Sequence, residues 1–96
     1  MEKWAVITPD KEKMRGLFDA IRNEHGQEFI KVENFVDDHF RLDLYKSFAL
    51  YWIPGLFIYR NLKYDKVWAD SDFQDKNKSL SFLYGRVVPG GEIIWI

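Results

Sequence analysis

The sequence predicts one α+β domain: an antiparallel β-sheet of about five to seven short strands, with one main amphipathic helix packed on one face. The 96 residues are the length of a single domain, so the domain spans residues 1–96. One segment has the apolar spacing of a helix with a buried side. In most other segments, apolar and polar residues alternate, or several apolar residues follow one another, between residues that favour turns. Both patterns are typical of strands.

The main helix is predicted over about Pro9–His25. The i, i+3, i+4, i+7 spacing of its apolar residues gives a buried face made of Met14, Leu17, Phe18 and Ile21. Thr8 is expected to cap the helix, and Pro9 to take the first helical position. Gly26 is expected to end the helix in a left-handed conformation.

The strands are predicted from β-branched and aromatic runs. They cover residues 3–8, 28–36, 39–45, 48–53, 56–60 with a continuation over 62–69, 80–84, and the two apolar arms 86–88 and 92–96. The alternation slips near Asn34, which indicates a bulge. Asp37-Asp38, Pro54-Gly55 and Pro89-Gly90 are expected to be turns.

Residues 39–45 alternate cleanly and predict a strand with one face in solvent. The face directed at the core would carry Phe40, Leu42 and Leu44. The wet face would carry His39, Arg41, Asp43 and Tyr45, with Arg41 paired to neighbouring acids.

The polar stretch 70–79 predicts a loop, followed by a strand at 80–84. A second helix near 72–84 is the competing interpretation, because Ser71 and Gln74 fit a capping box. The polar residues in the middle of this segment interrupt the apolar stripe, so we favour the loop and strand.

Charge and composition exclude several functional classes. The 14 basic and 15 acidic residues give a net charge of −1, whereas nucleic-acid-binding proteins are usually clearly basic. The absence of cysteine excludes disulfides, thiolate metal sites and cysteine nucleophiles. No serine lies in a nucleophile motif and no glycine-rich phosphate loop is present. We therefore expect a protein without a cofactor that is not an enzyme.

The N-terminal sequence lacks the basic start and apolar run of a secretory signal. The uncharged stretch 47–59 is shorter than the roughly 20 residues that a membrane helix needs, and Pro54-Gly55 interrupts it. These features predict a cytoplasmic protein without membrane contact.

The leading functional hypothesis is a small protein-binding module, such as an inhibitor, adaptor or immunity-type protein, of phage or bacterial origin. It rests on the 8 Phe, 5 Tyr and 4 Trp residues, because aromatic side chains contribute much of the energy of protein contacts. The candidate contact residues are Tyr51, Trp52, Tyr59, Trp68 and Phe73. A homodimer is expected as well, since one helix covers only one face of the sheet.

Two alternatives use other segments. Basic and aromatic residues interleave at 59–68, which suits single-stranded nucleic acid; the candidate residues are Arg60, Lys63, Tyr64, Lys66 and Trp68. The third interpretation is a metal-dependent hydrolase whose cation is held by Asp37, Asp38 and His39. The competing interpretation of these last residues is a turn leading into a solvated strand.

Overall fold

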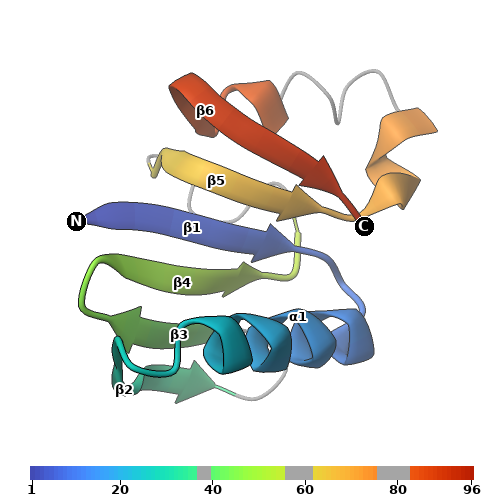
Figure 1. Cartoon of the computed structure of the whole chain (residues 1–96). Coiled ribbons are helices and arrows are strands. Elements are labelled where there is room, and N and C mark those ends of the chain that lie inside the picture. Colours follow the sequence, from blue (N-terminus) through green and yellow to red (C-terminus); the bar gives the residue numbers. More distant parts are fainter. Residues whose placement is uncertain (37–39, 56–61, 76–82) are drawn as a thin grey trace.

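The structure is a computed structural model that describes residues 1–36, 40–55, 62–75 and 83–96, with Gln74 and Asp75 described through their backbone only. Its elements are β1 (Glu2–Ile7), α1 (Lys11–Glu24), β2 (Phe29–Val36), β3 (Phe40–Tyr45), β4 (Phe48–Ile53), β5 (Tyr64–Ala69), the 3-10 helix η1 (Ser71–Asp75) and β6 (Val87–Trp95). The strands form one sheet in the order β2-β3-β4-β1-β5-β6, and α1 lies against one face of it (Figure 1). The predicted class, an α+β domain with one main helix on a sheet of this size, is confirmed.

The sheet is mixed. Strands β2, β3 and β4 are antiparallel neighbours, whereas β4, β1, β5 and β6 run parallel. The central strand β1 lies between β4 and β5, and its residues Ala5, Val6 and Ile7 are fully buried. A continuous apolar run is typical of strands covered on both faces, as in parallel sheets. The expected antiparallel pairing therefore holds on the β2–β4 side only.

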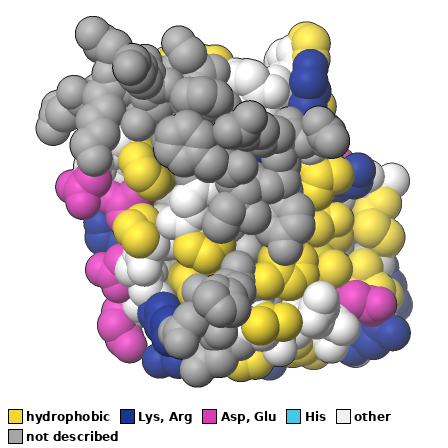
Figure 2. Space-filling model, turned by 180° about the vertical axis from the view of Figure 1, so that it is seen from behind, with side chains coloured by type: hydrophobic (Ala, Val, Ile, Leu, Met, Phe, Trp, Pro, Cys, Tyr) yellow, Lys and Arg dark blue, Asp and Glu magenta, His cyan; other side chains and the backbone are white. Residues whose placement is uncertain are grey.

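Two apolar clusters cover the two faces of the sheet. The first lies beneath α1 and is formed by Val6, Met14, Phe18, Ile21, Tyr45, Phe48, Leu50, Trp52 and Trp68. The second contains no residue of α1 and is formed by Ala5, Ile7, Ile53, Tyr64, Val67, Ala69 and Leu83. Hydrophobic side chains on the side away from α1 are visible in Figure 2.

Strand β4 is buried on both faces within one chain, and Tyr51 is its one partly exposed residue. The homodimer was expected because the segment 47–60 would present an uncovered apolar face. For the described part of that segment, the second cluster supplies the cover. The described part of the segment therefore lends the homodimer no support, and the homodimer stays a prediction.

The helix begins and ends differently from the prediction. The Asp10 carboxylate accepts hydrogen bonds from the N–H groups of Glu12 (2.9 Å) and Lys13 (3.3 Å), so Asp10 is the N-cap and Pro9 lies outside the helix. Thr8 does not cap it, because its side chain is bonded to Asp70. Gly26 is not left-handed; among the described glycines, only Gly90 has a positive φ.

Pro89-Gly90 is not a turn between two strands, as expected, but a bulge within the continuous strand β6. The register with β5 changes from Tyr64↔Val87 to Lys66↔Glu92, so β6 contains extra residues there. Gly90 absorbs the distortion with a φ of 82°. A Pro-Gly pair supplies the same local geometry to a bulge as to a turn, and long-range pairing selects between them.

The segment after β5 begins with η1, where a loop was expected. Tyr84 lies in a short helical turn with Leu83 and not in a strand. The predicted turn at 37–38, the strand portion at 56–60 and most of the alternative helix at 72–84 fall outside the described residues. In the described part of the chain, no helix is long and apolar enough to cross a membrane.

Candidate functional site

Large apolar side chains that are exposed concentrate on β2, which forms one edge of the sheet. Ile30, Val32, Phe35 and Val36 are 50%, 42%, 51% and 45% exposed. Only two other large apolar residues of the described chain are exposed, Met1 at the N-terminus and Tyr84 near β6. We call Val32 and Phe35, together with Arg41 of β3, the β2 surface.

Two bulges determine which side chains of β2 face α1. Phe29 pairs with Tyr45, Val32 with Asp43 and Phe35 with Arg41, so one extra residue lies in β2 within each interval. Residues directly opposite each other on paired strands share a face. Every third residue of β2 therefore lies on the α1 side, where regular alternation would place every second. The bulge predicted near Asn34 is confirmed.

A hollow of about 290 Å³ opens on this side and is lined by Val32, Phe35 and Arg41. Its wall is almost entirely apolar, so Arg41 contributes mainly the carbon atoms of its side chain. A larger hollow of about 420 Å³ is lined only by residues 23–28, at and after the end of α1. The β2 hollow differs from this one because side chains of two neighbouring strands form its walls. Its apolar walls and its volume suit the side chain of another molecule.

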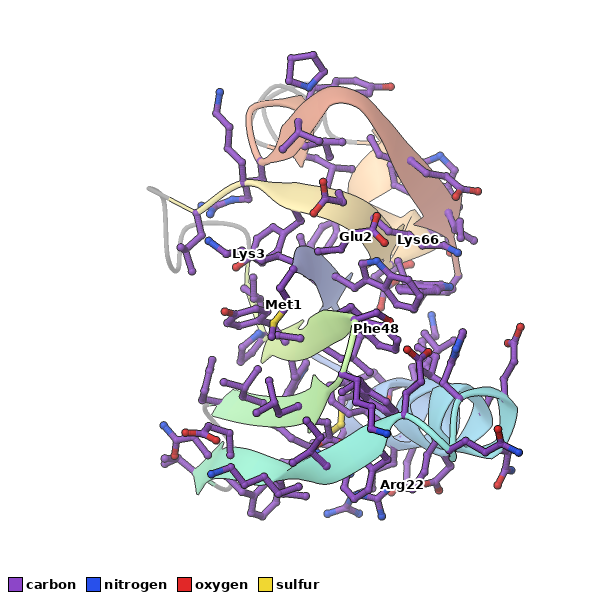
Figure 3. The ribbon with its side chains drawn as sticks, turned by 60° about the vertical axis from the view of Figure 1, so that its left-hand side comes forward. Met1, Glu2, Lys3, Arg22, Phe48 and Lys66 are labelled. Carbon is purple, nitrogen blue, oxygen red and sulfur yellow. The ribbon has the colours of Figure 1, made fainter. Side chains whose placement is uncertain are left out.

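A buried ionic cluster lies beside the hollow, between α1 and β3. Asp43 is fully buried and accepts two hydrogen bonds from Arg41, at 3.0 Å from Nε and 3.1 Å from Nη2. Arg22 of α1 approaches the same carboxylate at 3.9 Å and lies 3.7 Å from the centre of the Phe29 ring. Figure 3 shows Arg22 where α1 and β2 lie next to each other.

The predicted wet face of residues 39–45 is therefore wrong, because α1 covers it. Asp43 and Tyr45 are both fully buried, although the expected pairing of Arg41 with an acid is confirmed. Burial raises the pKa of Tyr45, the Asp43 charge raises it further, and the two arginines only partly oppose this. The phenol thus stays protonated at neutral pH.

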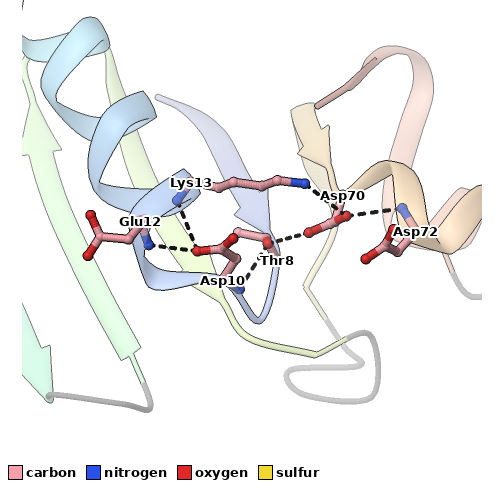
Figure 4. Close-up of polar contacts among 6 residues, drawn as sticks. All are labelled: Thr8, Asp10, Glu12, Lys13, Asp70 and Asp72. Carbon is pink, nitrogen blue, oxygen red and sulfur yellow. Dashed lines mark hydrogen bonds and ion pairs between the residues drawn. The ribbon is translucent and has the colours of Figure 1, made fainter.

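A second polar cluster ties together the carboxyl ends of β1 and β5 (Figure 4). The buried Asp70 carboxylate accepts hydrogen bonds from the Thr8 hydroxyl (2.6 Å), the Asp72 N–H (3.0 Å) and Lys13 Nζ (3.3 Å). Burial alone would raise the pKa of Asp70, but these donors lower it below its ordinary value. Asp10 already binds the first free N–H groups of α1, so the polar groups of this cluster have hydrogen-bond partners within the protein. The cluster therefore stabilises the fold by joining β1, α1 and the start of η1.

The aromatic residues predicted to bind a partner belong mainly to the core. Trp52 is 1% exposed and donates from Nε1 to the Thr8 carbonyl at 2.9 Å. Trp68 is 9% exposed, and Tyr51 and Phe73 are half-buried against the second cluster. Tyr59 lies outside the described residues. Trp52 and Trp68 are therefore unavailable to a partner in this fold, because the sheet buries them.

The residues predicted to bind nucleic acid do not form one surface. Lys63 is exposed, but Tyr64 is fully buried in the cluster away from α1, whereas Trp68 belongs to the cluster beneath α1. Lys66 lies over the rings of Trp4 and Trp68, at 4.9 and 5.1 Å, so its charge is directed at the protein itself. Arg60 lies outside the described residues.

The proposed metal ligands Asp37, Asp38 and His39 also lie outside the described residues. Within residues 1–36, 40–55, 62–75 and 83–96, no group of three or more acidic or histidine side chains could hold a metal ion.

Comparison with known proteins yields a structural likeness only. No family model and no curated sequence matches the chain. The large terminase from a thermophilic bacteriophage is similar in structure, with a TM-score of 0.57 and 11% identity over 99% of this chain. The same terminase in complex with ADP gives 0.57 and 10% identity. This chain spans about a quarter of the terminase, 24% and 25% in the two cases, and the likeness shows the fold alone.

The β2 surface was not predicted from the sequence, although one signal for it was present. Phe29, Val32 and Phe35 recur every third residue within a predicted strand that also showed a slip in alternation. Two bulges in one strand produce this spacing and bring the three side chains onto one face. Which of them stay exposed depends on which strands of the sheet α1 covers, and local sequence does not reveal that.

Proposed function

We propose that this chain is a protein-binding module, of the inhibitor, adaptor or immunity type, that holds a segment of its partner at the β2 surface. The observation that carries the proposal is the exposure of Val32 and Phe35 on one face of an edge strand, where they line a hollow with Arg41. Exposed apolar residues gathered in this way mark interaction sites, whereas single ones are ordinary surface features. Binding in place of catalysis also fits the internally satisfied cluster around Asp70.

The geometry favours insertion of a side chain over the addition of a long strand. The two bulges interrupt the regular spacing of backbone groups along β2, and bulged edges resist extended pairing. The hollow between Val32, Phe35 and Arg41 has room for an aliphatic or aromatic side chain. A side chain enclosed in such a pocket is the usual energetic centre of a protein interface.

The test compares three proteins: the wild-type chain, the double variant Val32→Ser/Phe35→Ser and the control Tyr84→Ser, which removes an exposed aromatic residue away from β2. A partner recovered with the tagged wild-type chain from its native cell is purified and titrated against each. We expect the double variant to bind at least about tenfold more weakly and the control to bind as wild type does. Equal binding by all three would contradict the proposal.

Two further measurements make the result interpretable. Thermal unfolding of the double variant shows whether the domain is intact, which we expect because both substituted side chains are exposed. Sedimentation equilibrium of the wild-type chain shows whether the occupant is a second copy. A dimer that the double variant dissociates would assign the β2 surface to self-association instead of to a different partner.

A further inference from the structure

The ionic cluster beside the hollow has more positive than negative charge. Arg22 and Arg41 face a single carboxylate, that of Asp43, among the residues that the structure describes. The other charged residues on β2, Lys31 and Glu33, pair with each other at 3.1 Å and add no net charge. Within the described chain, this cluster therefore contains two guanidinium groups and one carboxylate at the boundary between α1 and the β2 surface.

The donors of the two arginines are unequally used. Arg41 directs Nε and Nη2 at Asp43, and its Nη1 contacts the Met14 sulfur at 3.9 Å, a weak acceptor. Arg22 approaches Asp43 at 3.9 Å, which is beyond hydrogen-bonding distance, and its buried Nε has no hydrogen-bond partner in the described part of the chain. The Arg22 side chain is 42% exposed, so its terminal nitrogens can reach a ligand.

Arg22 lies at the next position along the face that carries the hollow, although it does not line the hollow itself. On β3, Arg41 lies opposite Phe35 and Asp43 lies opposite Val32. Arg22 contacts Asp43 and the next β2 residue on this face, Phe29. A group bound by Arg22 would therefore lie between Phe29 and Val32, next to the apolar opening.

We infer that the partner is a peptide segment with an acidic residue next to the aliphatic or aromatic one that enters the hollow, and that Arg22 binds its carboxylate. This inference rests on the proposed function of the β2 surface. A carboxylate matches the planar donors of arginine and adds a second negative charge to a cluster of two guanidinium groups and one carboxylate. The apolar lining favours a peptide over nucleic acid, since phosphate binding alone would not require Val32 and Phe35.

The test uses random linear peptides displayed on yeast and selected on the wild-type chain. Peptides that also bind the Val32→Ser/Phe35→Ser variant are discarded, which leaves those that depend on the β2 surface. One of the remaining peptides is synthesised with its acidic residue intact and with the matching amide, Asn for Asp or Gln for Glu. Both forms are titrated against wild type, Arg22→Gln and Arg22→Lys, because Arg22→Gln leaves the hydrogen bonds between Arg41 and Asp43 in place.

We expect the wild-type chain to prefer the acidic peptide about tenfold, Arg22→Gln to lose most of that preference, and Arg22→Lys to retain part of it. Equal affinity of the wild type for both peptides would overturn the inference while leaving the proposed function intact. Competition by a single-stranded oligonucleotide would also overturn it. If the selection yields no peptide that depends on Val32 and Phe35, the proposed function itself is contradicted.

Discussion

The Thr8 hydroxyl donates a 2.6 Å hydrogen bond to Asp70, 62 positions further along the chain. The two residues follow the adjacent parallel strands β1 and β5, and Lys13 of α1 joins them through Asp70 at 3.3 Å. One buried carboxylate thus fixes the central strands, the start of the helix and, through the Asp72 N–H, the start of η1.

The stability of this tie depends on pH. The pKa of Asp70 is lower in the folded chain than the ordinary value, so its contribution is present above the unfolded-state pKa of about 3.9 and is lost as pH falls through the folded value. We expect Asp70→Asn to reduce the free energy of unfolding by about 1–2 kcal/mol at neutral pH. The free energy of unfolding of the variant should also decrease less than that of the wild type as the pH is lowered. Urea unfolding at a series of pH values measures both effects.

Asp72→Asn is the matched control, because Asp72 contributes its backbone N–H to Asp70 and its side chain is not needed for that bond. It should leave the acid dependence close to that of wild type. An Asp70→Asn chain with an unchanged pH dependence would show that Asp70 does not act as argued.

The two arginines near Asp43 should differ in their contribution to stability. Arg41→Gln removes both close hydrogen bonds to a fully buried carboxylate, and we expect a loss of about 3–5 kcal/mol. Arg22→Gln removes a looser, partly exposed ion pair and should cost less than about 1 kcal/mol. Chemical denaturation of the two variants tests this; equal losses would contradict the unequal roles assigned to the two side chains.

Two glycines give opposite predictions. A Cβ at Gly16 in α1 would have no atom within 4 Å, so Gly16→Ala should stabilise the chain by about 0.5–1 kcal/mol through the unfolded state. A Cβ at Gly91 would lie 2.5 Å from Val87 Cγ1 and 3.0 Å from the Asp65 carbonyl oxygen. Gly91→Ala should therefore destabilise it by about 1–3 kcal/mol. Melting temperatures that move in the same direction for both variants would oppose this interpretation of the bulge.

Most elements could be located from the sequence because their signals are local. The apolar spacing of Met14, Leu17, Phe18 and Ile21 predicts α1, and the apolar runs at 3–8 and 48–53 predict β1 and β4. The pairing of these strands is not local, since β1 aligns with β4 across more than forty residues. A strand pattern carries no information on its direction relative to a distant partner, so the parallel half of the sheet was not foreseen.

The candidate site was predicted less well, for a related reason. The alternation in 39–45 correctly separates two faces but does not indicate which one α1 covers, so Asp43 and Tyr45 were expected in solvent. Trp52 and Trp68 were expected to be available for binding. In the six-stranded sheet, however, both are buried in the apolar cluster beneath α1. Exposure is a property of the assembled fold, and the β2 surface became evident only there.

The central claim is that the partner contacts β2 and the adjacent part of β3. Its most direct test is backbone hydrogen–deuterium exchange of the chain, alone and saturated with the purified partner or a selected peptide. We expect binding to slow exchange at residues 30–36 and around Arg41, with little change at Asp70–Phe73. Slowing confined to β5, η1 or β6, with no effect on β2, would contradict the claim.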